Sequence, residues 1–188
     1  MNWYKLASFN EDLLDSLVRD LGKEKGKLLT EDVEKEIKNI GIPYRFENIA
    51  AYGMAKNDIC IISDRLLWFS PSNLIFSLFH ELAHYYQYRK YGQDIAISIY
   101  TNPESEIQKD IKLLKEIELT ADKFARLKAS YYIKKYKINY PITMTGYRYT
   151  LDSVLRDHLL KIKKQVKDMN YTTVQEINEH IYNQIKAK

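Results

Sequence analysis

Apolar residues recur at helical spacing in the N-terminal part of the chain. Between Asn10 and Leu21, a leucine or valine occurs every three or four positions, which predicts an amphipathic helix that Gly22 ends. Thr30 is followed by acidic residues, a pattern typical of an N-cap residue and a first turn, and it predicts a second helix that ends at Gly41. The N-terminal pattern therefore favours two helices.

The pattern changes to shorter, strand-like runs between Tyr44 and Phe69. The run Asp58–Ser63 is apolar at nearly every position and is the clearest strand. Gly53 and the residues 56–58 are typical of turns. Two or three antiparallel strands fit this region.

Helical patterns return after the strands. Ser70 and Pro71 form a helix start, with serine as the N-cap and proline at the first helical position, and we expect this helix to end near Gly92. The other predicted elements are a long helix from Asn102–Pro103 to Tyr132, a loop or hairpin over Tyr140–Tyr149, and helices over Thr150–Met169 and Thr172–Ile185. This order of elements predicts the α+β class.

Length and composition allow one domain with an extension. With 188 residues and 22.3 kDa, we expect a main domain over residues 1–135 and a C-terminal loop and helical extension over residues 136–188 that packs on it. The single Cys60 excludes an internal disulfide. The N-terminus lacks the apolar region of a signal peptide, and no apolar run could span a bilayer, so we expect a cytoplasmic protein without a membrane partner.

The charge distribution does not argue for a nucleic-acid partner. The chain has 29 Lys and Arg residues against 25 Asp and Glu residues, which gives a net charge of +4 at pH 7. The two signs are mixed along the chain, whereas nucleic-acid binding favours a basic patch or stripe. Individual motifs therefore carry more information than the total charge.

The stretch SLFHELAHYYQY, residues 77–88, contains an H-E-x-x-H motif. His80 and His84 are four residues apart, so on a helix both imidazoles can reach one zinc ion. Glu81 is rotated by one residue, which directs its carboxylate to the water on the metal as a general base. The alternative is a core or solvent-facing helix that carries two histidines by chance, and the motif favours the metal site.

A zinc hydrolase site of this kind needs a third protein ligand. The extended motif with a glycine and a third histidine is absent, because Gln87 and Lys90 occupy those positions. His158 and His180 are candidates, but isolated histidines on amphipathic helices are more often surface or boundary residues. A carboxylate on another helix is therefore the better candidate.

Glu118 and Asp122 offer such carboxylates, four residues apart on the long predicted helix. Ala121 and Ala125 share their side of the helix and would let a partner helix approach closely. We predict that Glu118 binds the metal and that Asp122 accepts a hydrogen bond from the free ring N–H of a ligating histidine. The alternative is a pair of surface carboxylates that face lysines at helical spacing.

The motif HELAH, followed downstream by E-x-x-A-D-x-F-A, resembles the ImmA/IrrE-type metallopeptidases, which are small cytoplasmic zincins of bacteria, phages and mobile elements. The resemblance implies a mini-zincin fold with a small antiparallel or mixed sheet, an H-E-x-x-H helix and a second ligand-bearing helix, here with a C-terminal helical extension. It implies that His80, His84 and Glu118 bind Zn²⁺. It also implies that Glu81 is the general base and that Asp122 orients a ligand.

The chain departs from the family pattern in several places. Ala83 stands where the family often has glycine, and the gap between His84 and Glu118 is long. No helix-turn-helix segment is found, and residues 140–188 have no counterpart in the pattern. The resemblance covers about half of the chain and rests on two short motifs.

These features predict a zinc-dependent metallopeptidase, and an endopeptidase rather than an exopeptidase. The substrate would be a protein or peptide, and the resemblance suggests a regulatory protein or a phage repressor. One alternative is a zincin-fold binding module that keeps its zinc and acts on protein or DNA partners without proteolysis, through C-terminal helices with the basic run Lys161–Lys164. Another is a helical interaction protein without metal.

Two further expectations concern the substrate. Peptide hydrolysis needs an oxyanion donor, and the candidates are Tyr140, Tyr147, Tyr149 and His158, among which the sequence does not choose. A peptide would bind as an added strand along Asp58–Ser63, since the edge of a strand can pair with an extended backbone.

Overall fold

The computed structural model describes residues 10–49, 53–56, 59–144, 152–169 and 176. The helices are α1 (Glu11–Leu21), α2 (Lys23–Ile40), α3 (Pro71–Thr101), α4 (Ile107–Tyr136) and α5 (Asp152–Met169), and the strands are β1 (Tyr44–Glu47), β2 (Gly53–Lys56) and β3 (Ile59–Ser63). The short 3-10 segments η2 (Asp64–Trp68) and η3 (Glu104–Glu106) precede α3 and α4. This content confirms the α+β class.

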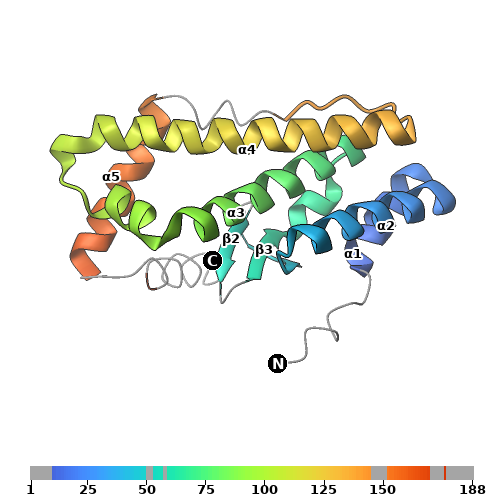
Figure 1. The fold of residues 1–188 in the computed structure, drawn as a ribbon, viewed down its shortest axis with the longest axis horizontal. Coiled ribbons are helices and arrows are strands. Elements are labelled where there is room, and N and C mark those ends of the chain that lie inside the picture. Colours follow the sequence, from blue (N-terminus) through green and yellow to red (C-terminus); the bar gives the residue numbers. More distant parts are fainter. Residues whose placement is uncertain (1–9, 50–52, 57–58, 145–151, 170–175, 177–188) are drawn as a thin grey trace.

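The long helices α3 and α4 lie side by side (Figure 1). The sheet packs against α3 on the side away from α4. The helices α1 and α2 form a pair beside the sheet. The main core includes Phe79 of α3 and Tyr132 of α4, whose rings stack with centroids 6.0 Å apart. Among the described residues, no helix combines the length and hydrophobicity needed to cross a bilayer.

The three strands form a mixed sheet in the order β1-β3-β2. β1 pairs with β3 in parallel, with Tyr44 opposite Cys60, whereas β2 pairs with β3 antiparallel, with Gly53 opposite Ile62. The prediction of antiparallel strands is therefore wrong for β1. In the chain, β2 comes between β1 and β3 and runs in the opposite direction to both. In the sheet, β2 lies at the edge beside β3, and β3 runs in the same direction as β1.

The strand β3 is the central strand of the sheet. Cys60, Ile61 and Ile62 are at most 1% exposed, and burial on both faces explains why successive positions of this run are apolar. The prediction that a peptide adds to Asp58–Ser63 is wrong, because both edges of β3 are already paired; Asp58 itself lies outside the described residues. Within the described strands, β2 keeps one unpaired edge.

The helix α2 begins seven residues before Thr30, at Lys23. Thr30 is fully buried inside the helix, where its Oγ1 donates a hydrogen bond of 2.8 Å to the carbonyl of Gly26. The N-cap prediction is wrong because threonine can satisfy its hydroxyl within a helix in this way. Gly26 also lets α1 and α2 pack closely, since a Cβ there would lie 2.6 Å from the backbone of Val18.

The helix α3 continues past Gly92 to Thr101, so the predicted end is wrong. A glycine inside a helix lowers the stability of the helix by about 1 kcal/mol relative to alanine. A cost of this size does not have to end the helix. The described residues 137–144 contain no strand, and residues 145–149 of the predicted loop or hairpin lie outside the description. The predicted helix over Thr172–Ile185 also lies outside it, apart from Glu176.

The helix α5 packs across the ends of α3 and α4 that adjoin the loop between them (Figure 1). A small apolar core forms there from Ile99, Ile107, Ile111, Leu155 and Leu159. Lys163 of α5 is buried, with its Nζ 2.8 Å from the carboxylate of the buried Asp110. The same ammonium group donates hydrogen bonds to the carbonyls of Ile99 and Asn102. These partners offset the cost of burying a charge, and they hold α5 in place.

Candidate metal centre

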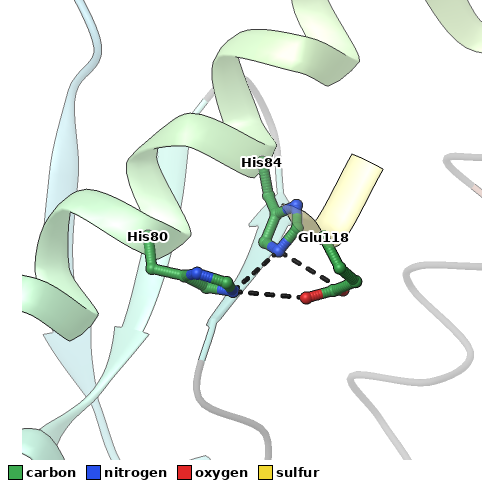
Figure 2. Close-up of side chains that lie close together, drawn as sticks. All are labelled: His80, His84 and Glu118. Carbon is green, nitrogen blue, oxygen red and sulfur yellow. Dashed lines mark hydrogen bonds and ion pairs between the residues drawn. The ribbon is translucent and has the colours of Figure 1, made fainter. Parts of the chain in front are cut away.

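The apolar face of α3 determines how this helix is rotated. Leu78, Phe79 and Leu82 are at most 1% exposed and lie in the main core. His80 and His84 lie on another side of α3, and their rings point toward Glu118 of α4 (Figure 2). The packing of the core thus directs both histidines to the neighbouring helix.

Three side chains from these two helices meet at one place, as the sequence predicts. The Nε2 atoms of His80 and His84 are 3.0 Å apart. Glu118 places Oε2 at 3.4 Å from His80 Nε2 and Oε1 at 3.4 Å from His84 Nε2 (Figure 2). One possible ligand atom from each residue lies within 4.8 Å of the other two, so the group could hold a metal ion.

The separations resemble those of ligands around a single small cation. At metal–ligand distances of about 2.0–2.1 Å, two ligands of a tetrahedral zinc ion lie about 3.4 Å apart. Glu118 Oε2 is also buried without a hydrogen-bond partner among the described residues. Buried polar atoms normally have a partner, and a cation would satisfy this one. Two imidazoles and one carboxylate therefore form a donor set that could hold a metal ion.

Two alanines let α4 pack tightly on the side that carries Glu118. Ala121 and Ala125 are one turn apart and fully buried. Their small side chains allow close packing of the helix, so the reach of a glutamate is enough to meet both histidines. The sequence predicts this role from the positions of the alanines beside Glu118 and Asp122.

The second ring nitrogen of each histidine faces an acceptor of its own. His80 Nδ1 lies 3.3 Å from Asp122 Oδ1, so the structure brings Asp122 to the ring that it is predicted to orient. His84 Nδ1 forms a hydrogen bond of 3.1 Å with Gln87 Oε1. Sequence reasoning missed this role of Gln87, although the residue follows His84 by three positions and so lies on the same side of the helix. Both rings thereby direct Nε2 toward Glu118.

Glu81 lies beside the strand β2 and is not one of the three converging side chains. A Cβ atom at Gly53 would lie 2.2 Å from Glu81 Oε2, so the carboxylate occupies the space that a side chain would fill. Gly53 belongs to β2 and not to a turn, and the close approach of Glu81 explains a glycine there. Burial raises the pKa of Glu81, and the nearby His84 and His80 partly oppose the rise.

Negative charge gathers around the group. Burial opposes ionisation of Glu118, yet the adjacent rings of His80 and His84 lower its pKa to about 2. Burial likewise opposes protonation of His84, but the hydrogen bond to Glu118 and the charges of Glu118 and Glu81 raise its pKa to about 9. The charge that favours a proton on His84 would also favour a divalent cation between the side chains.

Tyr140 is the one candidate oxyanion donor whose side chain is described. Its carbonyl accepts a hydrogen bond from Ser72, which precedes His80 by about 12 Å along α3. Tyr140 is 43% exposed, and its backbone lies beside the first turn of α3. The other candidates lie outside the described residues or have side chains outside them: Tyr147, Tyr149 and His158.

Comparisons with known proteins add no information about this site. No protein-family profile, curated protein sequence or solved structure matches the chain. The interpretation of the site therefore rests on the positions of its own side chains, above all on the convergence of His80, His84 and Glu118.

Proposed function

We propose that the chain is a zinc-dependent metallopeptidase of the ImmA/IrrE type, an endopeptidase that acts on a protein or peptide substrate. The observation that carries the proposal is the convergence of His80, His84 and Glu118 from two helices. Two further observations support it: Glu118 Oε2 has no hydrogen-bond partner among the described residues, and an acceptor faces the Nδ1 atom of each histidine. Zinc is proposed because H-E-x-x-H hydrolases with two histidines and a glutamate bind this ion.

The proposed reaction divides the work between the metal and Glu81. Bound zinc would lower the pKa of its water to about 7 and polarise the scissile carbonyl. Glu81 would accept a proton from the water and donate it to the leaving amine. The raised pKa of Glu81 suits this role, because the same group has to take up and release a proton. Asp122 and Gln87 would hold the two imidazoles in place.

The edge of β2 that pairs with no described strand is the proposed position of an extended peptide. This strand is an outer strand of the sheet, and its Gly53 lies directly against the carboxylate of Glu81. A peptide paired with this edge would present its backbone near Glu81 whatever its side chains are. The edge of β2 thus replaces β3 in the proposed mode of substrate binding.

The proposal predicts one zinc ion per chain and hydrolysis that depends on it. Treatment with a chelator should remove the metal and abolish hydrolysis of a mixed peptide library, because the water would lose its activating ion. Added zinc should restore both. Elemental analysis measures the metal, mass spectrometry measures the cleaved peptides, and a mock-treated sample is the control. Undiminished hydrolysis after complete removal of the metal would refute the proposal.

Gly53→Ala should slow hydrolysis about 100-fold without changing zinc content or the free energy of unfolding. The new methyl group would lie 2.2 Å from Oε2 and 2.8 Å from Cδ and Cγ of Glu81, so this flexible side chain would have to shift. The displaced carboxylate would then be misaligned with the water, and a misplacement of about 1 Å costs about 100-fold in rate. Steady-state kinetics and denaturant unfolding measure the two effects.

Gly26→Ala is the control for Gly53→Ala, with the opposite expected result. Its methyl group would meet the backbone of Val18, which cannot move without separating α1 from α2. This variant should lose stability, while its folded fraction should keep the native rate. A native rate in Gly53→Ala would show that the contact between Glu81 and β2 does not matter for hydrolysis.

The binding-module alternative gains no support from the described residues. The run Lys161–Lys164 does not form a continuous basic surface, because Lys163 is buried and pairs with Asp110. Lys161 and Lys164 remain exposed, as on an ordinary solvated helix face. The metal-free alternative explains the contacts of Glu118 with His80 and His84 as ion pairs alone, and it gives no role to their arrangement as possible metal ligands.

A further inference from the structure

Gln87 connects the candidate metal centre to both long helices. It lies on α3, three residues after His84, and its Nε2 donates a hydrogen bond of 3.0 Å to the carbonyl of Ile117 on α4. Its Oε1 lies 3.1 Å from Nδ1 of His84. Ile117 immediately precedes Glu118, so one side chain contacts both a ring of the group and the segment that carries the carboxylate.

The chemistry of these partners determines where a hydrogen sits on His84. A backbone carbonyl only accepts hydrogen bonds, so the NH₂ group of Gln87 has to face Ile117 and its oxygen has to face His84. An amide oxygen also only accepts, so Nδ1 of His84 has to be the donor. When the ring of His84 is neutral, Nε2 is then the nitrogen that offers a lone pair, and it is the one that faces Glu118.

We propose that Gln87 is a positioning residue that keeps a hydrogen on Nδ1 of His84 and thereby turns Nε2 toward His80 and Glu118. The use of Nε2 as a metal ligand rests on the proposed function. The orientation of the ring rests on the two hydrogen bonds alone. Gln87 acts on the proposed reaction only through His84.

A neutral acceptor suits this position. The ring of His80 faces the carboxylate of Asp122, and the carboxylates of Glu81 and Glu118 lie close to both histidines. The amide of Gln87 orients the second ring without adding a fourth negative charge to this cluster. The Nδ1 atoms of the two histidines therefore face different groups, a carboxylate at His80 and an amide at His84.

Imidazole NMR of the metal-free protein tests the role of Gln87. In the native chain, the Nδ1–H of His84 should give a proton resonance that is protected from exchange, and the chain has only four histidines to assign. Gln87→Met should lose this resonance and bind zinc about 10- to 100-fold more weakly in competition with a chelator. Gln87→Glu should keep the resonance, because a carboxylate also accepts from Nδ1. Gln108→Met, at an exposed position of α4, should match the native chain.

Several results would overturn the proposal. An unchanged resonance or an unchanged zinc affinity in Gln87→Met would show that other groups position His84. Loss of the resonance in Gln87→Glu would also refute the proposal, because an acceptor at position 87 would then not be enough to keep the hydrogen on Nδ1 of His84. Gln87→Leu repeats the test if Gln87→Met does not fold, and the backbone amide spectrum checks the fold of each variant.

The same experiment separates this inference from the proposed function. A native chain that binds no zinc, but whose His84 resonance is lost in Gln87→Met, would refute the zinc-dependent function and leave the orienting role of Gln87 intact. A native chain that binds zinc with equal affinity in Gln87→Met would leave the function intact and refute the role of Gln87.

Discussion

Glu81→Gln is expected to bind zinc as the native chain does and to hydrolyse peptides about 100- to 10,000-fold more slowly. The amide keeps the size and polarity of the carboxylate, but it cannot accept a proton from water. Zinc should be retained, because Glu81 lies against β2 and outside the group of three converging side chains. Metal analysis and peptide kinetics on the same preparation measure both quantities.

The matched control is Glu24→Gln, at an exposed position of α2, which should keep both zinc and hydrolysis. A native rate in Glu81→Gln would show that another group acts as the base. Loss of zinc together with the rate would show that Glu81 takes part in holding the metal, which would change its proposed role from base to ligand.

Glu118→Ala and His80→Ala are expected to lose zinc under conditions in which the native chain keeps one ion. Each change leaves two protein ligands where a catalytic zinc site has three. The loss should exceed that of Asp122→Asn, for which a reduction in affinity of about 10- to 100-fold is expected because Asp122 only orients His80. Dialysis against zinc buffers followed by elemental analysis ranks the three variants.

Glu116→Ala serves as the control for Glu118→Ala. Glu116 is exposed and lies two residues before Glu118, on roughly the opposite face of α4. This variant should keep the native zinc content. Full zinc content in Glu118→Ala would exclude Glu118 from the ligands and require a third ligand elsewhere.

The members of the candidate centre could be predicted because helix geometry determines most of their arrangement. A spacing of four residues puts His80 beside His84 on one helix and Glu118 beside Asp122 on another, whatever the rest of the fold is. The need for a third ligand then links the two pairs. The described structure brings all four side chains together.

The strand pairing could not be predicted in the same way, because it depends on contacts between distant segments. The run of Cys60, Ile61 and Ile62 predicts a strand, but the strands that pair with it depend on the arrangement of the whole sheet. Its continuous apolar pattern is nevertheless typical of a strand buried on both faces, and that reading argues against a free edge at β3. Gly92 lies inside α3 because a single glycine weakens a helix only slightly and need not end it.

The roles of Gln87 and Gly53 depend on partners that no local pattern reveals. Gln87 matters because the carbonyl of Ile117 and the ring of His84 lie at its two ends. Gly53 matters because the carboxylate of Glu81 fills the space beside it. The sequence predicts a turn at Gly53 and gives Gln87 no role at the centre, because the function of both residues follows only from three-dimensional neighbours.

The anchoring of α5 has a consequence for shortened or recombined versions of the chain. A version that stopped at residue 135 would lose Leu155 and Leu159 and open Ile99, Ile107 and Ile111 to water. It would also leave the carboxylate of Asp110 without its lysine. Both defects fall where α3 passes into α4, so the alignment of the two helices would loosen from that end. Exchange of C-terminal segments between chains of this kind would therefore have to bring along a replacement for α5.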